Sequence, residues 1–221
     1  MSNETTRKVF IMNNELLNFL AQMAILVPAF LISLSFHEFA HAFVSNILGD
    51  TTAKKSGRLT LNPLAHIDPI GLLFLAVFHI GWAKPVPFNQ NNFKYPKLYS
   101  ILTGFAGPVA NFILAIFCFV LIRFFPADLF PLVFTKSFFQ IVEATAYVNV
   151  MLGVFNLLPI PPLDGSHVIT AFFQDKYPRF IFWLYQYSMF ILIFLVFLPI
   201  TRDWLFKLII FTYNFLRSLV F

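Results

Sequence analysis

The stretch Phe36-His37-Glu38-Phe39-Ala40-His41 lies inside an apolar run that extends from Leu16 to Leu48. On a helix, two histidines four residues apart project from the same face. In this H-E-x-x-H pattern, His37 and His41 can bind one zinc ion, and Glu38 lies beside the metal, where it can take a proton from water. The alternative is a histidine pair hydrogen-bonded in a helical core. Because ionisable groups at membrane depth are costly, we favour the zinc site.

Composition places the chain among membrane proteins. Of its 221 residues, 59% are hydrophobic and only 11% are charged, whereas soluble domains contain about 25% charged residues. The net charge of +5 is spread over short loops, without a basic stripe interleaved with aromatic residues. This pattern favours the lipid bilayer over nucleic acid as a partner. The single cysteine, Cys118, excludes a cysteine zinc site within one chain, and the sequence leaves the oligomeric state open.

The apolar segments predict the membrane topology. They fall at about 16–48, 70–83, 98–125, 137–160, 178–200 and 204–221. A spanning helix needs about 20 residues, so the second segment is predicted to be re-entrant or interfacial. The first segment is either one long helix or a helix pair, with Pro28 as the point of a bend or break. We expect an all-α polytopic membrane protein with about five to six membrane segments, forming a single transmembrane metalloprotease domain over residues 1–221.

Two polar loops follow the H-E-x-x-H segment. The stretch Arg58–Pro63 is compatible with a short strand that ends in a turn, and Pro85 and Pro87 exclude a helix but permit an extended edge strand. We therefore expect a small β-hairpin or edge-strand element after the H-E-x-x-H helix. Loops 49–69 and 84–97 each carry three Lys or Arg residues. The positive-inside rule places both loops, and the opening of the site, on the cytoplasmic side.

A zinc protease also needs a third protein ligand. Asp164 follows a proline-rich break in an apolar segment, where irregular backbone is tolerated if protein or a water-filled cavity surrounds it. The other role open to Asp164 is to cap the helix that follows it. Glu143 is the rival ligand, although it is expected near the opposite face of the membrane. The other three histidines have simpler explanations. His66 is expected to make a hydrogen bond within its loop, His79 to lie at the membrane interface, and His167 to be a neighbour of Asp164.

Two asparagines lie within apolar segments. Asn111 follows Gly107-Pro108, and we expect it to hydrogen-bond between helices that pack closely through small residues. Asn156 lies two helical turns before Asp164. It is therefore close enough to the proline-rich break to hold substrate or to polarise a carbonyl.

Together these stretches resemble the site-2 protease family of intramembrane zinc metalloproteases. The resemblance implies that His37, His41 and Asp164 bind one zinc ion per chain, that Glu38 is the catalytic acid and base, and that Asn156 helps to hold substrate. The middle blocks are similar to those of short bacterial members, and we expect neither a PDZ insertion nor a CBS domain. The blocks that carry the resemblance are His37-Glu38-Phe39-Ala40-His41, Gly57-Arg58-Leu59-Thr60-Leu61-Asn62-Pro63, Gly81-Trp82-Ala83-Lys84-Pro85-Val86-Pro87, Gly107-Pro108 with Asn111, and Asn156 through Gly165.

The resemblance implies an intramembrane endopeptidase that cleaves transmembrane segments of other proteins, often releasing regulators from the membrane. We expect a multi-pass protein of the cell membrane, namely the bacterial inner membrane, with a transmembrane protein as substrate. Such a substrate must unwind locally, and residues 84–89 are the candidate edge that holds it by strand addition. One alternative is a membrane metal transporter or metal-binding protein that uses the same ligands, although it would not need Glu38 and would more often show paired repeats. A second alternative is a catalytically inactive membrane scaffold.

Overall fold

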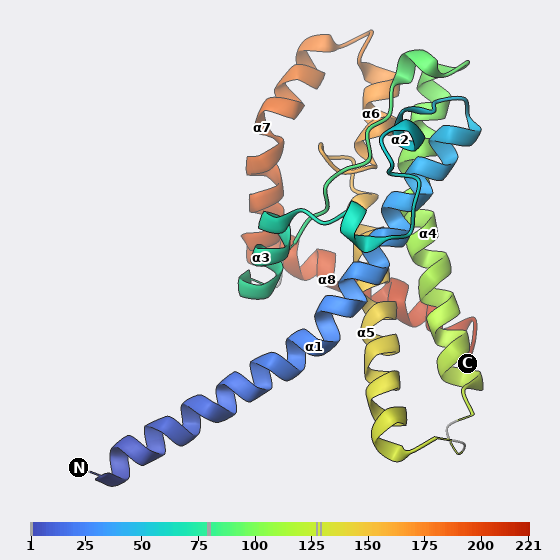
Figure 1. The fold of residues 1–221 in the computed structure, drawn as a ribbon. Helices are drawn as coiled ribbons and strands as arrows, with labels where there is room; N and C mark the ends of the chain where they lie inside the picture. The colour runs from blue at the N-terminus through green and yellow to red at the C-terminus, as the bar shows by residue number, and fades with distance from the viewer. Residues whose placement is uncertain (1, 79–80, 127, 129) are drawn as a thin grey trace.

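The computed structural model describes residues 2–78, 81–126, 128 and 130–221, apart from the side chains of 2–14 and 76–78. The regular elements within these ranges are all helices, joined by loops, and no strand is present there (Figure 1). The helices in chain order are α1 (Ser2–Ile47), α2 (Thr52–Lys55), η1 (Pro63–Ala65), α3 (Pro69–Phe78), η2 (Gln90–Asn92), α4 (Pro96–Phe124), α5 (Leu132–Asn156), α6 (Ser166–Phe173), α7 (Pro178–Phe197) and α8 (Pro199–Ser218).

Four of these helices are long and apolar enough to cross a membrane, namely α1 from Glu15 onward, α4, α5 and α7. Proline occupies the first position of α4, α7 and α8, where its missing N–H costs nothing because that donor has no partner inside the helix. The first apolar segment forms one helix rather than a pair, and Pro28 lies inside α1 without ending it. As predicted, the short second segment forms a helix of only 10 residues, α3, which is too short to span.

The prediction of five to six membrane segments is not confirmed, because the last apolar segment does not qualify as a spanning helix. This segment forms α8, which packs against α4, α5 and α7 and runs across the other long helices (Figure 1). The physical reason lies in its composition. The α8 helix contains the charged residues Arg202, Asp203, Lys207 and Arg217. It therefore has no continuous apolar stretch of the length that a spanning helix needs.

The predicted β-hairpin is likewise not confirmed among the described residues. The two loops meet at a single antiparallel bridge between Ile67 and Ala83, and the Lys84 N–H donates to the His66 carbonyl at 3.0 Å. The pairing stops there because Pro85 and Pro87 have no N–H to continue a ladder. On the other side, Asn62 caps η1 and turns the chain away.

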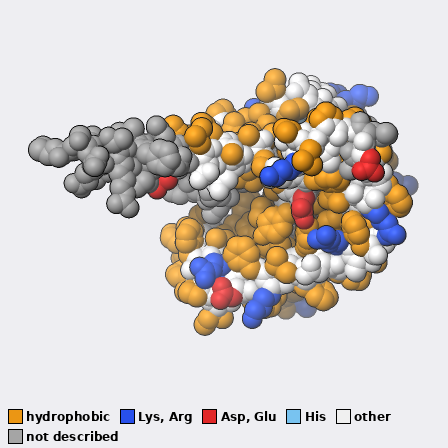
Figure 2. Space-filling view, turned by 90° about the horizontal axis from the view of Figure 1, so that it is seen from below, with side chains coloured by type: hydrophobic (Ala, Val, Ile, Leu, Met, Phe, Trp, Pro, Cys, Tyr) orange, Lys and Arg blue, Asp and Glu red, His pale blue; other side chains and the backbone are white. Residues whose placement is uncertain are grey.

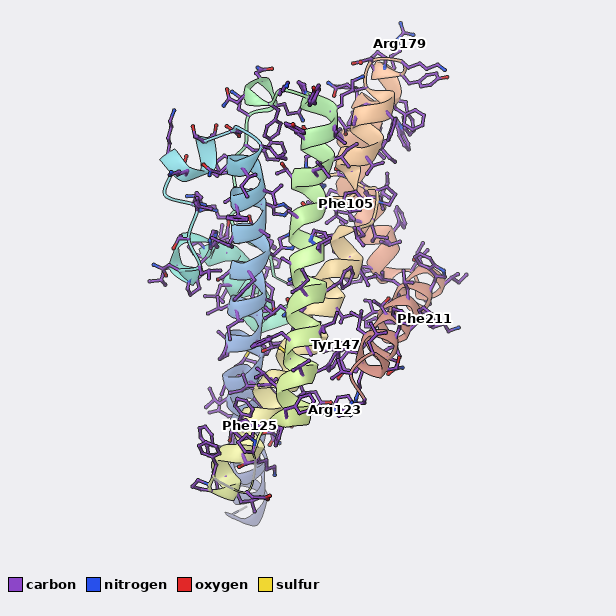
Figure 3. The ribbon with its side chains drawn as sticks, turned by 90° about the vertical axis from the view of Figure 1, so that its right-hand side faces the viewer. Phe105, Arg123, Phe125, Tyr147, Arg179 and Phe211 are labelled. Carbon is purple, nitrogen blue, oxygen red and sulfur yellow. The ribbon has the colours of Figure 1, made fainter. Side chains whose placement is uncertain are left out.

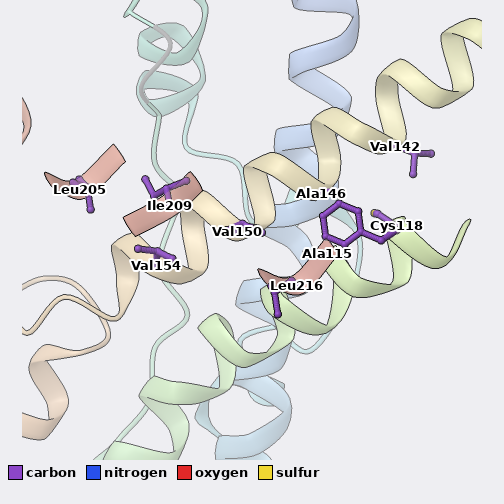
Figure 4. Packing of buried hydrophobic residues seen from close by; sticks show 10 residues of the cluster. Ala115, Cys118, Val142, Ala146, Val150, Val154, Leu205, Ile209 and Leu216 are labelled. Atoms are coloured by element: carbon purple, nitrogen blue, oxygen red, sulfur yellow. The ribbon is translucent and has the colours of Figure 1, made fainter. Parts of the chain in front are cut away.

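The core lies between α1, α4 and α5, and α8 closes one side of it. The largest cluster of buried hydrophobic residues combines small and branched side chains, which lets the helices approach closely. Figure 4 shows these residues on three helices: Ala115 and Cys118 on α4, Val142, Ala146, Val150 and Val154 on α5, and Leu205, Ile209 and Leu216 on α8.

The outer surface of the bundle is apolar. Only 11% of the most apolar stretch of α7 is buried within the protein, and large side chains such as Phe182, Phe190 and Phe197 are exposed. Figure 2 shows that hydrophobic side chains dominate the underside as well, with charged side chains scattered among them. In Figure 3, Arg179 lies at one end of the molecule, and Arg123 and Phe125 lie at the other. A surface of this kind suits hydrocarbon better than water.

Candidate metal centre

The two histidines of α1 lie side by side and are both buried, with exposed fractions of 5% for His37 and 8% for His41. Their Nε2 atoms are 3.0 Å apart. Asp164, far away in the sequence, places its Oδ2 atom 3.1 Å from His37 Nε2 and 3.4 Å from His41 Nε2. Within the described part of the chain, these three residues form the one group of His, Cys, Asp or Glu side chains that could hold a metal ion.

Hydrogen bonds on the far side of each imidazole ring fix its tautomer. His41 Nδ1 lies 2.7 Å from the carbonyl oxygen of Thr103, which can only accept, so Nδ1 must carry the proton. His37 Nδ1 lies 2.6 Å from Asn111 Oδ1. The amide nitrogen of Asn111 is engaged elsewhere, by Asn149 Oδ1 at 2.7 Å, which supports this orientation of the amide. In the neutral imidazoles, both Nε2 atoms therefore present lone pairs toward Asp164.

Three lone-pair donors thus converge on one point. Asp164 Oδ2 is buried and accepts no hydrogen bond, so without a cation these atoms would repel one another and remain unsatisfied. In tetrahedral zinc sites with bond lengths of about 2.0–2.2 Å, ligand atoms lie about 3.3–3.6 Å apart. The observed separations of 3.0 to 3.4 Å are close to this value. The donor set and its spacing therefore fit a small divalent cation such as zinc.

The break after α5 brings Asp164 to the histidines. The Gly165 N–H donates to the carbonyl of Asn156 at 2.7 Å, which folds the chain back against the end of α5. A Cβ at Gly165 would lie 2.3 Å from the Leu157 carbonyl oxygen, so only glycine fits this turn. Asp164 does not occupy the cap position of α6, which is Gly165, and no side-chain hydrogen bond caps this helix.

Two glycines on α4 give the site its room. A Cβ at Gly107 would lie 2.4 Å from His41 Nε2 and 2.5 Å from His37 Cε1, far inside van der Waals contact. One turn earlier, a Cβ at Gly104 would lie 2.7 Å from the ring of His167 and 3.1 Å from the carbonyl oxygen of Asp164. The side-chain-free face of α4 therefore forms one wall of the metal centre.

Glu38 is buried beside this centre, with 7% of its surface exposed. Its Oε2 atom accepts a hydrogen bond from the backbone N–H of Val86 at 2.9 Å. Val86 belongs to the loop that we predicted to form an edge strand. The structure thus connects the glutamate of the H-E-x-x-H motif directly with that loop, although no strand forms there.

The rival third ligand, Glu143, lies elsewhere. It receives a hydrogen bond from Tyr213 Oη at 3.4 Å, lies 4.0 Å from Arg217 Nη1 and lines a cavity of about 570 Å³ bordered by α1, α5 and α8. Asn156, predicted to hold substrate, donates its side-chain amide to the Leu152 carbonyl at 3.0 Å. Its predicted role toward substrate therefore stays a prediction.

The remaining histidines also have surroundings of their own. His66 Nε2 bonds the Thr60 carbonyl at 2.8 Å within its loop, as expected. His167 packs against Phe88 with ring centroids 5.3 Å apart. Burial, only partly opposed by Asp164, lowers the pKa of His167 below its ordinary value. His79 lies outside the described residues.

A polar network behind His37 was missed from the sequence. Asn111, which we expected to hydrogen-bond between helices, contacts the ring of His37 on α1 and is itself held by Asn149 and by the Ser33 carbonyl at 3.2 Å. Its specific partners were not predicted. Asn149 in turn donates to Ser33 Oγ at 2.7 Å. The available signal was that two fully buried asparagines occur in apolar segments, where an amide needs partners.

Comparisons with known proteins agree with this geometry. The profile of Peptidase family M50 matches residues 131–196, which include Asp164. A Bacillus subtilis (strain 168) protein named "Putative zinc metalloprotease YwhC" is 43% identical over 153 residues, covering 68% of this chain and 69% of that protein. The Mycolicibacterium smegmatis protein "Putative zinc metalloprotease Rip2" is 30% identical over 206 residues, covering 90% of this chain and 76% of the relative.

A third relative is "Zinc metalloprotease MJ0392" of Methanocaldococcus jannaschii, which is 30% identical over 169 residues, or 76% of this chain and 38% of that protein. No solved structure matches the chain. The chain belongs to peptidase family M50, the site-2 protease family. The resemblance seen in the sequence motifs is thereby confirmed.

Proposed function

We propose that this protein is an intramembrane zinc endopeptidase that hydrolyses peptide bonds within or near the transmembrane segments of other membrane proteins. The observation that carries the proposal is the convergence of His37 Nε2, His41 Nε2 and Asp164 Oδ2, 3.0 to 3.4 Å apart. Membership of family M50 supports peptide hydrolysis, and the names of the relatives support zinc as the metal. We expect one zinc ion per chain, with a fourth position left for water or substrate.

Zinc in this position would act as a Lewis acid toward water and the scissile carbonyl. The residues of the chain hold and move the proton. Glu38 Oε2 is held by the Val86 N–H, which leaves Oε1 to take a proton from the attacking water and to deliver it to the leaving amine nitrogen. Asn111 and the Thr103 carbonyl hold the two imidazole rings so that both Nε2 atoms face the metal position.

The substrate presents a physical problem of its own. A transmembrane helix satisfies its peptide groups internally, so the bond to be cut must first be freed by local unwinding. Residues 84–89, which we call the edge segment, pass Glu38 at Val86 and are our candidate for the backbone along which the unwound strand lies. Asn156 is the candidate for a further substrate contact, because its carbonyl already fixes the turn that carries Asp164. Release of membrane-tethered regulators is the physiological role that we propose.

The same proposal includes an orientation. We infer a multi-pass protein of the bacterial inner membrane whose site opens toward the cytoplasm. The helix α2, the start of α4 and the start of α7 lie at one end of the bundle (Figure 1), and an exposed ion pair between Lys97 and Asp175 joins the first turn of α4 to the loop before α7. The positive-inside rule favours a cytoplasmic position for this end, because it carries six of the 15 Lys and Arg residues of the chain. These are Lys54, Lys55, Lys94, Lys97, Lys176 and Arg179.

Reconstitution separates a protease from a metal transporter that uses the same three residues. The purified full chain is placed in liposomes together with a single-span reporter protein, and both reporter cleavage and zinc entry into the vesicles are followed. The proposal predicts cleavage that a zinc chelator stops and that added zinc restores. Zinc entry with an intact reporter would instead identify a transporter. The absence of both cleavage and zinc entry would indicate a scaffold.

A further inference from the structure

The edge segment is irregular, yet the position of one atom in it is closely defined. Val86 is 8% exposed, and its N–H meets Glu38 Oε2 at 2.9 Å. Its neighbours Pro85 and Pro87 have no N–H, so Val86 is the sole backbone donor between Lys84 and Phe88. A shift by one residue in either direction would present a proline to Glu38. Since no strand ladder holds this backbone among the described residues, something else must fix its register.

The first anchor is Arg58, which binds the start of the edge segment. Its guanidinium group is buried, with 7% of the residue exposed, and donates to the carbonyl oxygens of Ala65, Lys84 and Pro85, the last at 3.3 Å. Hydrogen bonds from an ionised donor are stronger than those between neutral groups, and the planar guanidinium offers several donors in a fixed geometry. Arg58 therefore fastens the two residues that precede Val86 to the loop before α3.

The second anchor is Asp50, which binds the other end of the edge segment. This carboxylate is fully buried just beyond the end of α1. Its Oδ2 accepts from the Asn89 N–H at 2.7 Å, and its Oδ1 accepts from Asn92 Nδ2, also at 2.7 Å. Thr52 supplies two further hydrogen bonds, from its N–H at 3.0 Å and its hydroxyl at 2.5 Å. Burial raises the pKa of Asp50, but these hydrogen bonds lower it by more. The net pKa is therefore below its ordinary value, and the group is charged at neutral pH.

We propose that Arg58 and Asp50 are positioning residues that together clamp the edge segment at both ends, and so hold the Val86 N–H against Glu38 and the substrate-binding edge beside the metal centre. One anchor acts at residues 84 and 85 and the other at residues 89 and 92, with Val86 between them. Neither residue touches the metal ligands in the contacts above. Both therefore act on catalysis through the segment, because an orienting partner must itself be held rigidly. The proposal rests on the proposed protease function.

The test compares Arg58→Lys, Asp50→Asn and the double variant in the full chain. Three quantities are measured: zinc content, hydrogen exchange of residues 84–93 without substrate, and kcat and KM for a single-span reporter in liposomes. We expect zinc content and the exchange of α1 to stay at the wild-type level, exchange in residues 84–93 to rise, and kcat to fall by about 10-fold or more. Because release at either end frees the same segment, the double variant is expected to lose little more than the worse single variant.

Matched controls come from the same loops. Lys54→Gln removes an exposed charge close to Arg58 in the sequence, and Asp68→Asn changes a carboxylate whose hydrogen bonds come from the N–H groups of Ile70 and Gly71 at the start of α3. Both controls are expected to keep wild-type exchange and kcat. Asn92→Ala removes only one of the four hydrogen bonds to Asp50, and it provides a milder variant if the two principal ones do not fold.

Several results would overturn the clamp. These are unchanged exchange in residues 84–93, wild-type kcat despite faster exchange, loss of activity that parallels loss of zinc, and multiplied losses in the double variant. If the wild-type protein does not cut the reporter, the proposed function fails. The hydrogen exchange still tests the clamp in that case, because it requires no substrate.

Discussion

His37 Nδ1 and Asn111 Oδ1 lie 2.6 Å apart, although they belong to α1 and α4 and are 74 residues apart in the sequence. This contact sets the orientation and tautomer of a proposed metal ligand, and such partners typically contribute 10- to 100-fold to metal affinity. We expect Asn111→Ala to weaken zinc binding by about that factor, measured by competition with a chelator of known affinity.

Asn149→Ala is the matched control for that experiment. It removes the support of the Asn111 amide at 2.7 Å but leaves the contact between Asn111 and His37 in place. A smaller loss of zinc affinity is expected than in Asn111→Ala. Equal losses in both variants would mean that the network stabilises the bundle as a whole and does not specifically orient His37.

Gly107→Ala tests the wall of the metal centre. The added Cβ would lie 2.4 Å from His41 Nε2, and neither the histidine nor the α4 backbone can move without disturbing the other. We expect loss of bound zinc and of cleavage, while the far-UV circular dichroism stays helical. Val109→Ala, on an exposed face of α4, is the control and should behave as wild type. Normal zinc content in Gly107→Ala would show that the two helices are not so closely packed.

The third ligand is tested by a pair of acidic residues. Asp164→Ala should lower zinc content well below one ion per chain, because it removes one of three converging donors. Glu143→Ala should keep its zinc, since Glu143 contacts Tyr213 and Arg217 instead. Metal analysis of the purified variants decides between them. Full occupancy in Asp164→Ala would contradict the assignment of the site.

The orientation in the membrane is tested by labelling with an impermeant thiol reagent. In a Cys118→Ala background, a cysteine in place of the exposed Lys55 should react only after the cells are opened. A cysteine in place of Leu132, which is 81% exposed at the opposite end of the bundle, should react in intact cells. The reversed pattern would place the metal centre on the outer side.

Local patterns were sufficient to predict which three side chains converge, but not the groups that support them. The spacing of His37 and His41 follows from helix geometry, and the proline-rich break before Asp164 could be recognised in the sequence alone. The carbonyl of Thr103 and the N–H of Val86 could not be found in this way. Both are backbone groups, which every residue carries, so their roles depend on how distant segments pack.

The errors in the predicted fold have a different origin, because the residues responsible are visible in the sequence. Hydropathy made the last segment look like another span, whereas α8 carries charges and packs across α4 and α5. The predicted hairpin required a hydrogen-bond ladder that Pro85 and Pro87 cannot supply. The buried charged residues Asp50 and Arg58 hold these loops where a ladder would otherwise do so. Such long-range contacts leave no periodic pattern in the sequence.

The most direct test of the account is the substitution Glu38→Gln in the full chain. This change preserves the size of the side chain and removes the base, which typically contributes about 10²- to 10⁴-fold to the rate. Zinc content and cleavage of a single-span reporter are measured on the same preparation. The account predicts about one zinc ion per chain, as in wild type, together with a loss of cleavage by at least about 100-fold. Cleavage at the wild-type rate by zinc-loaded Glu38→Gln would contradict it.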